Sequence, residues 1–434
     1  MKTRSYMRMC HRLAPLLAAI LTGLPAVSFS QTTEVTLEQA VELALRASPA
    51  VVQARGNVDI AGAGRREAVG NWLPTISGSG GWSANSTNRF DPNTQRTVSG
   101  SATSYSTSLS ASMVIFDGFR RSATNRSADA DITSANAALS DQRFEVVLAT
   151  KRIFFNALAG MDLVRVAQTR IERSQRQLSI TREKLAAGTA VRSDTLSSFV
   201  DFSNARLQLL NAETQLATAT ADLGRVMGID GAIAVRESQA TSVGMAVDTS
   251  GLRQEALLNS PSIRVAEAGV RAANAQLTVS RSLYFPSVSA SYSQSWSGDA
   301  LSNLSNSWSA RVSVNWPIFN GFSREAGVSR SSANTDFARA RQRDTRRRVN
   351  AELTRQFAAL ESARLRMDIA DASHAAAEEE LRVRQERYRL GVSTIVEVLV
   401  SQVSLDQSDV DFVQAKLDFF IAKAEIETLI GREI

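Results

Sequence analysis

The sequence predicts a mainly helical protein that carries a membrane β-barrel and is built from a duplicated helix–hairpin–helix unit. Three observations in its 434 residues predict this fold class. Serine alternates with apolar residues in four short segments, as in strands with one polar and one apolar face. Motifs of the first half recur in the second half. Stretches without proline are long enough for helices of about 100 Å.

The first 30 residues are read as a secretory signal peptide. Four basic residues precede an apolar run over 13–27, which is too short to span a bilayer. Small residues ahead of Gln31 suit cleavage at that point, and cleavage after Ala26 or Ser28 is the alternative. The only cysteine, Cys10, lies before the apolar run, so we expect no N-terminal lipid anchor.

The strand-like segments predict two hairpins. Serine occupies every second position of 104–112, and mostly apolar residues fill the places between. Three further segments show the alternation: 75–83, 287–296 and 307–316. We expect strands of about ten to twelve residues in hairpins at about 73–118 and 285–321, long enough to cross a bilayer when tilted. A soluble β-sandwich would turn the apolar face inward, whereas a membrane barrel with a water-filled lumen turns it outward.

In the barrel interpretation, the serine faces line water and the aromatic residues lie at the membrane interfaces. The predicted lumen-facing residues are Ser106, Ser108, Ser110, Ser289, Ser291, Ser309 and Arg311. The predicted membrane girdle consists of Trp82, Trp296, Trp308 and Trp316. For any one aromatic residue, packing against the helices is an equal alternative.

The repeat covers nearly all of the chain after the signal peptide. Phe116-Asp117-Gly118-Phe119 returns as Phe319-Asn320-Gly321-Phe322, and Gly188 returns as Gly391 at the same spacing. Ser48-Pro49 returns as Ser260-Pro261 at a larger spacing. A loop about nine residues longer in the first hairpin, near 85–100, explains the difference. We expect the two repeats to span 31–240 and 250–434.

Each repeat is expected to pair a long helix with two shorter ones. The long helices are predicted over 122–187 and 323–390, each about 100 Å long. The shorter helices of the first repeat, at 49–71 and 192–227, nearly match one long helix when stacked end to end. A strict heptad of large and small apolar residues from Phe202 predicts supercoiled packing.

Four strands in one chain cannot close a barrel. An open sheet edge in lipid leaves backbone groups without hydrogen-bond partners, so several chains must share one barrel. Three chains give twelve strands, whereas two give eight and leave little lumen. A soluble coiled-coil scaffold without a pore is the alternative, but it leaves the hairpins unexplained.

Composition argues against several classes of function. After the signal peptide the chain has no cysteine and a single histidine, His374, so thiol catalysis, zinc binding and a histidine-based triad lack residues. We expect no enzyme activity, no metal and no cofactor. The formal charge of +6 falls to about +2 without the four basic residues of the signal peptide, which removes most support for nucleic-acid binding. The arginine-rich run 339–348 is interpreted as a solvated helix face.

The order and spacing of these motifs resemble the TolC family of outer-membrane efflux proteins. The duplicated plan, the two Phe-Asp/Asn-Gly-Phe strand ends and the run from Tyr388 to Leu399 carry the resemblance, which spans about 36–431. It implies a homotrimer in outer-membrane lipid. In that trimer a 12-stranded β-barrel is continuous with a 12-helix α-barrel that projects into the periplasm. It also implies a periplasmic adaptor (a membrane fusion protein) and an inner-membrane pump as partners.

The resemblance also implies a gate at the periplasmic tips, where the adaptor docks. Gly188 and Gly391 match the tip turns, Asp194 and Tyr388 match a polar pair that holds the tips closed, and Glu397 matches an acidic position at the constriction. Ser193 lies beside this group. Ser393 stands where some members carry a locking arginine, and Val400 where a second acid can occur. An ordinary solvated helix charge is the alternative for Glu397.

The predicted function is a passive exit channel of a tripartite system that exports small molecules such as drugs. Export of a protein by type I secretion is the alternative, since one passive duct can serve either cargo. A periplasmic coiled-coil scaffold without a pore is a third hypothesis.

Overall fold

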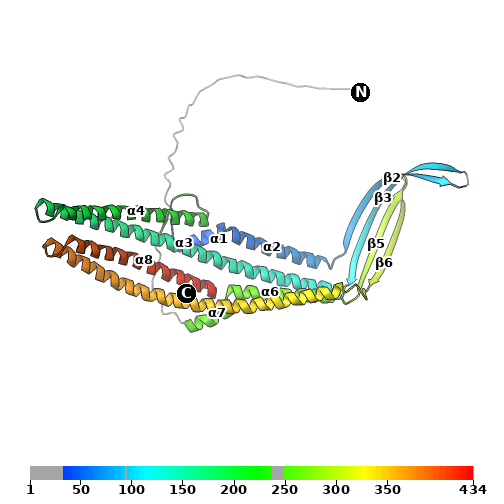
Figure 1. The fold of residues 1–434 in the computed structure, drawn as a ribbon. Coiled ribbons are helices and arrows are strands. Elements are labelled where there is room, and N and C mark those ends of the chain that lie inside the picture. Colours follow the sequence, from blue (N-terminus) through cyan, green and yellow to red (C-terminus); the bar gives the residue numbers. More distant parts are fainter. Residues whose placement is uncertain (1–32, 93–94, 237–248, 434) are drawn as a thin grey trace, which may run out of the picture.

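The computed structural model describes residues 33–92, 95–236 and 249–433. The predicted signal peptide lies outside the described residues. The chain forms a long rod of helices with a four-stranded sheet at one end (Figure 1). Among the described helices, none combines the length and the hydropathy of a membrane-spanning segment.

Both halves of the chain use the same order of elements. The first half contains α1 (Leu37–Ala47), α2 (Pro49–Gly70), β2 (Thr75–Asp91), β3 (Arg96–Phe116), α3 (Arg120–Ala186) and α4 (Arg192–Met227). The second half contains α5 (Thr249–Asn259), α6 (Pro261–Ser282), β5 (Ser287–Gly298), β6 (Ser305–Asn315), α7 (Ser323–Arg389) and α8 (Ile395–Ile430). Two short strands, β1 (Thr33–Val35) and β4 (Ile233–Val235), pair in parallel.

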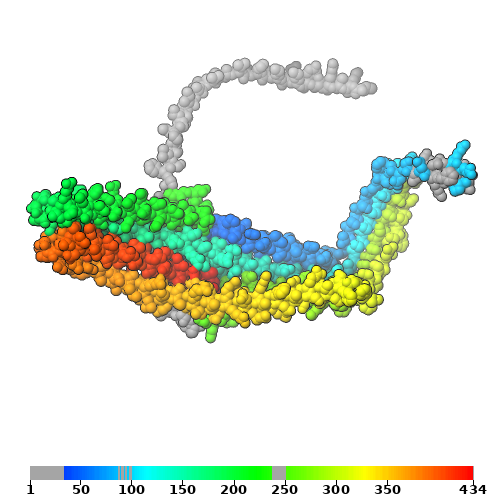
Figure 2. Space-filling model, viewed as in Figure 1, coloured from blue at the N-terminus to red at the C-terminus, as the bar shows by residue number. Residues whose placement is uncertain are grey.

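The predicted helices are confirmed to within about two residues at each end. The long helices α3 and α7 have 67 residues each, which corresponds to about 100 Å. The shorter α2 and α4 both pack along α3. Helix α6 packs along both α3 and α7, and α8 packs along α7 and also touches α3. The helices therefore form a layer, with α2 and α4 along one edge and α7 along the other (Figure 2).

The main apolar core lies at the middle of the rod. There the short helices α1 and α5 and the β1–β4 pair pack against parts of α3, α4, α6, α7 and α8. The rings of Phe155 and Phe420 stack with centroids 5.0 Å apart, which joins α3 to α8. The buried Nζ of Lys151 lies 2.6 Å from Oε2 of Glu427 in the same region. This junction connects the two halves of the chain.

The first hairpin differs from the sequence prediction. β5 and β6 have 12 and 11 residues as predicted, but β2 and β3 have 17 and 21. The expected long loop at 85–100 is wrong, because strand pairing continues from Asn85 opposite Ala102 to Asp91 opposite Arg96. The only proline of this stretch, Pro92, follows β2 directly, so nothing interrupts the ladder earlier. The hairpin extends beyond β5 and β6 (Figure 1).

Candidate functional site

Four rows of small polar residues cross one face of the sheet. The strand order is β2-β3-β5-β6, and the register places serine opposite serine in almost every row. The hydroxyl oxygens of Ser79 and Ser108 lie 2.8 Å apart, and those of Ser295 and Ser307 also lie 2.8 Å apart. All seven residues predicted to face the lumen share this face: Ser106, Ser108, Ser110, Ser289, Ser291, Ser309 and Arg311.

The opposite face carries the apolar side chains and most of the predicted girdle. Trp82, Trp296 and Trp308 lie on it, and the Trp308 ring stacks on Tyr292 with centroids 6.4 Å apart. Trp316 follows the last strand, and its indole Nε1 donates to the carbonyl oxygen of Tyr284 at 3.3 Å. The four predicted girdle tryptophans thus separate into three residues on the strands and one residue, Trp316, at the joint with the helices.

Matched arginine contacts fix that joint in both halves. The Arg121 guanidinium lies 4.4 Å from the ring centroid of Trp72, and that of Arg324 lies 4.2 Å from Tyr284. Asp117 accepts from the backbone N–H of Arg121 at 3.0 Å. A bulge between Val114 and Phe116 places Phe116 opposite Val288 on the apolar face. The sequence reasoning missed these arginines, although their spacing equals that of the repeated Gly118 and Gly321.

Gly188 and Gly391 form the turns at the far tips of the rod, as predicted from their positions. Their φ angles are +71° and +80°, a region that favours glycine. Each turn closes with a backbone bond back to the long helix, from Thr189 N–H to Lys184 at 2.9 Å and from Val392 N–H to Arg387 at 3.0 Å. The tips are therefore tight and built alike.

Tyr388 and Asp194 influence each other at the tips without a hydrogen bond. Tyr388 is buried, and its hydroxyl bonds to no described residue. Burial and then the charge of Asp194 raise the pKa of Tyr388 above its ordinary value. The Nζ of Lys184 lies 4.5 Å from the Tyr388 ring centroid and also donates to the Tyr388 carbonyl oxygen. Lys184 is thus a second tip contact that sequence reasoning missed.

Glu397 has a local structural role at the start of α8. Its carboxylate and the Thr394 hydroxyl form a capping box, and Glu397 also pairs with Arg384 of α7. The Ser393 hydroxyl, the Thr394 backbone and Arg384 hold the pKa of Glu397 below its ordinary value. Ser193 and Val400 are exposed at the same tips.

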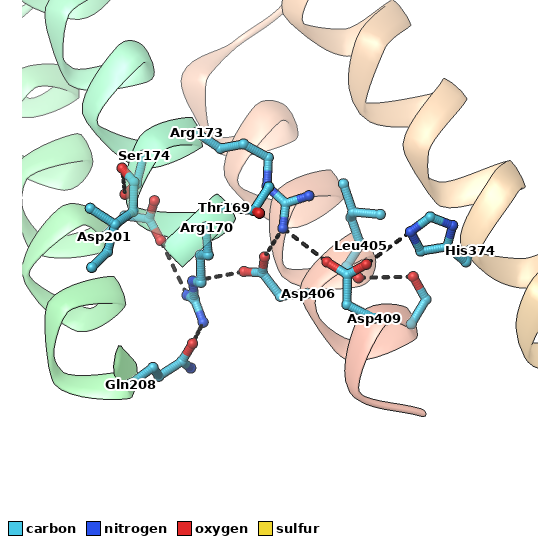
Figure 3. Close-up of polar contacts among 12 residues, drawn as sticks. Thr169, Arg170, Arg173, Ser174, Asp201, Gln208, His374, Leu405, Asp406 and Asp409 are labelled. Carbon is cyan, nitrogen blue, oxygen red and sulfur yellow. Dashed lines mark hydrogen bonds and ion pairs between the residues drawn. The ribbon is translucent and has the colours of Figure 1, made fainter. Parts of the chain in front are cut away.

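Between the tips and the middle of the rod, a largely buried polar network joins α3, α4, α7 and α8 (Figure 3). We call this group, Arg170, Arg173, Asp201, His374, Asp406 and Asp409, the inter-coil network. Arg170 of α3 lies 2.8 Å from Asp406 of α8 and 3.5 Å from Asp201 of α4. Arg173 reaches Asp406 and Asp409 at 3.0 Å each. The partly exposed His374 of α7 lies 2.9 Å from Asp409.

Burial governs the ionisation of this network. Burial raises the pKa of Asp406 to about 6, although Arg170 and Arg173 oppose the shift. Burial likewise raises the pKa of Asp201, against the pull of Arg170. The network was not predicted from the sequence because its charged residues are spaced along each helix as they would be on a solvent-exposed face. The signal available was that Asp406 directly follows Leu405, a residue of the apolar seam.

Comparisons with known proteins agree with this geometry. The family model described as outer membrane efflux protein matches residues 40–229 and 252–432. Protein CyaE of Bordetella pertussis is 28% identical over 87% of this chain and 81% of its own length. The probable efflux pump outer membrane protein TtgC of Pseudomonas putida is 22% identical over 91% of this chain and 82% of its own.

A solved structure shows the same fold. The Campylobacter jejuni CmeC outer membrane channel superposes with a TM-score of 0.80 at 18% identity, over 97% of this chain and 94% of that one. Channels of this kind, rather than enzymes, make up the family. They are outer-membrane homotrimers with a helical tunnel in the periplasm, and they work with periplasmic adaptors and inner-membrane pumps. The family match covers most of the sequence, and the chain therefore belongs to the outer membrane efflux protein family.

Proposed function

We propose that three copies of this chain form a passive exit channel for small molecules, with a shared 12-stranded barrel and a 12-helix tunnel. The observation that carries the proposal is the four-stranded sheet with one face made mostly of serine hydroxyls, joined to helices about 100 Å long. In the barrel the hydroxyl face surrounds water and the apolar face meets lipid.

The open edges of the sheet support assembly with other copies. The outer strands β2 and β6 each pair on one side only. Backbone groups at such edges need partners inside a membrane, so β6 of one copy pairs with β2 of the next until the ring closes. Three copies of a four-stranded sheet give an even number of strands and a water-filled lumen.

The helical layer has exposed apolar side chains along the matching edges. On α4, Leu207 and Leu210 are each 59% exposed, and on α7 Ile369 is 65% exposed. Exposed apolar residues in such number mark a surface that another protein covers. A ring of copies places the α4 edge of one against the α7 edge of the next, which buries both.

The tips form the proposed gate, and the inter-coil network stabilises its closed state. Opening requires the α7–α8 pair to move relative to α3–α4, which pulls Asp406 and Asp409 away from Arg170 and Arg173. Ser393 and Val400 replace two polar links that other members can have, so a larger share of the locking energy falls on the inter-coil network. Adaptor docking at the same tips, around Gly188 and Gly391, would release it.

The proposed cargo is a small molecule, which the description of TtgC as part of an efflux pump supports. The direct test deletes this chain from the producing cells and measures both drug susceptibility and secreted proteins. We expect higher susceptibility that the wild-type chain reverses, with the secreted proteins unchanged. Loss of a secreted protein at unchanged susceptibility would assign the channel to type I secretion instead.

A further inference from the structure

Arg311 is the one charged residue within the four hydroxyl rows of the sheet. These rows run from Thr75–Ser112–Ser291–Arg311 to Gly81–Ser106–Ser297–Ser305. Arg311 lies opposite Ser291 in the strand ladder. On the same face, Ser309 lies opposite Ser293, and the Ser313 hydroxyl is hydrogen-bonded to that of Ser289. A guanidinium remains charged at every physiological pH.

No carboxylate of the sheet neutralises this charge. β5 and β6 contain no aspartate or glutamate, and no described residue forms an ion pair or hydrogen bond with the Arg311 side chain, which is exposed. Other arginines at the helix–sheet joint differ: Arg121 is buried against Trp72, and Arg324 pairs with Glu325. Arg311 therefore places an exposed positive charge without a counter-charge on the hydroxyl face.

The position of Arg311 is at the base of the sheet. Among the four rows that cross all strands, its row contains Thr75, the first residue of β2, and lies closest to the helices. Everything that passes between the tunnel and the barrel must cross this level. Charges in a channel wall act more strongly than charges on an open surface, because the low-dielectric wall focuses the field into the water.

We propose that Arg311 from three copies forms a cationic collar at the barrel base that attracts small and organic anions and disfavours cations. This inference rests on the proposed trimeric pore. It makes Arg311 a residue that determines cargo specificity by charge, in a region separate from the tips and from the inter-coil network.

The local potential can be measured by the reaction rate of an introduced thiol. Ser309→Cys places a thiol on the same face, about 7 Å from Arg311 along the strand. The probes are two methanethiosulfonates of similar size, one with a sulfonate and one with a trimethylammonium group. The rate of each reagent is measured on the purified trimer in lipid vesicles at 10 mM salt and divided by its rate with a free thiol.

The collar predicts a normalised sulfonate-to-ammonium rate ratio above one, which Arg311→Gln lowers about fivefold. Arg311→Lys should keep the ratio, and Arg311→Glu should invert it. With unmodified Arg311, raising salt to 1 M should remove most of the preference, which tests the charge without altering Arg311. The matched control, Ser305→Cys on the same face and strand but about 20 Å away, should respond to Arg311→Gln less than twofold.

The outcomes separate the collar from the pore. If both reagents react at residue 309 but the ratio ignores Arg311→Gln and salt, the pore stands and the collar is wrong. If neither reagent reaches residue 309 or 305 in membranes, the hydroxyl face is not wet, and the proposed pore is wrong together with the collar.

Discussion

The Nε of Arg170 lies 2.8 Å from Oδ2 of Asp406, and this buried contact joins a helix of the first half to a helix of the second (Figure 3). Both side chains are largely buried, at 7% and 11% exposure. Removing one partner of such a pair leaves the other charge without compensation in a medium of low dielectric constant.

Arg170→Met should therefore destabilise the helical rod by about 3 kcal/mol. The measurement is urea unfolding of the trimer followed by its helical circular dichroism signal. Arg165→Met is the control, because Arg165 is 68% exposed and pairs with Asp162 of the same helix at 3.1 Å. The control should change stability by less than about 1 kcal/mol. Equal effects of the two substitutions on the unfolding free energy would show that the buried Arg170 pair contributes no more to stability than an exposed pair.

The raised pKa of Asp406, about 6, predicts a pH-dependent contribution to stability. A carboxyl whose pKa is higher in the folded than in the unfolded chain contributes stability that is complete below its ordinary pKa and is lost as pH rises through the folded value. From pH 5 to pH 7 this group should destabilise the wild type by about 1 kcal/mol. Asp406→Asn removes this titration, so the difference in unfolding free energy between wild type and variant should shift by that amount. A difference independent of pH would contradict the ionisation assigned to Asp406.

Gly118 and Gly321 provide a matched test of the joint between sheet and helices. Both have left-handed backbones, with φ of +66° and +64°. A Cβ added at Gly118 would lie 2.3 Å from Cβ of Phe285, whereas one at Gly321 would meet nothing within 4 Å. Alanine at either position carries the backbone strain, but only Gly118→Ala adds a collision.

Gly118→Ala should therefore reduce the yield of heat-stable trimer severely, while Gly321→Ala costs about 1 kcal/mol. The measurement is the fraction of chain that remains trimeric on a gel after heating. If the two substitutions have equal effects, close packing of Phe285 on Gly118 does not determine the geometry of the joint.

The two tip helices differ in their N-terminal caps. Thr394 caps α8 in a capping box, whereas Val191 stands at the same position of α4 with an extended backbone and no side-chain cap. Thr394→Ala should weaken the first turn of α8 by about 1 kcal/mol, and Val191→Thr should strengthen that of α4. Amide hydrogen exchange in the first turn of each helix measures both changes. Faster exchange in α4 after Val191→Thr would contradict this assignment.

Much of the fold could be predicted because its signals are local. The absence of proline and the heptad from Phe202 define the helices, and the serine alternation defines the face of each strand. The extension of β2 and β3 was missed because polar residues around Asn85 are as common in loops as in a two-stranded ribbon. The bulge after Val114 was missed because it depends on pairing with β5, which lies far away in the sequence.

The inter-coil network could not be predicted for a related reason. Arg170 and Arg173, like Asp406 and Asp409, are three residues apart, which is also the spacing of solvated charges on a helix surface. Only the packing of α3 on α8 buries them and brings opposite charges together. The tip glycines were easier to identify, because a left-handed turn between two helices restricts the choice of residue.

The orientation of the hydroxyl face is the claim on which the exit channel depends, and adjacent residues of β3 test it most directly. A fluorophore is attached to Ser108→Cys or Leu109→Cys in trimers reconstituted into lipid vesicles, and its quenching is compared for aqueous iodide and for nitroxide-labelled lipid. Because the two side chains point to opposite faces of the strand, we expect iodide to quench residue 108 more strongly and labelled lipid to quench residue 109 more strongly. Stronger lipid quenching at residue 108 than at 109 would contradict a water-filled barrel lined by serine.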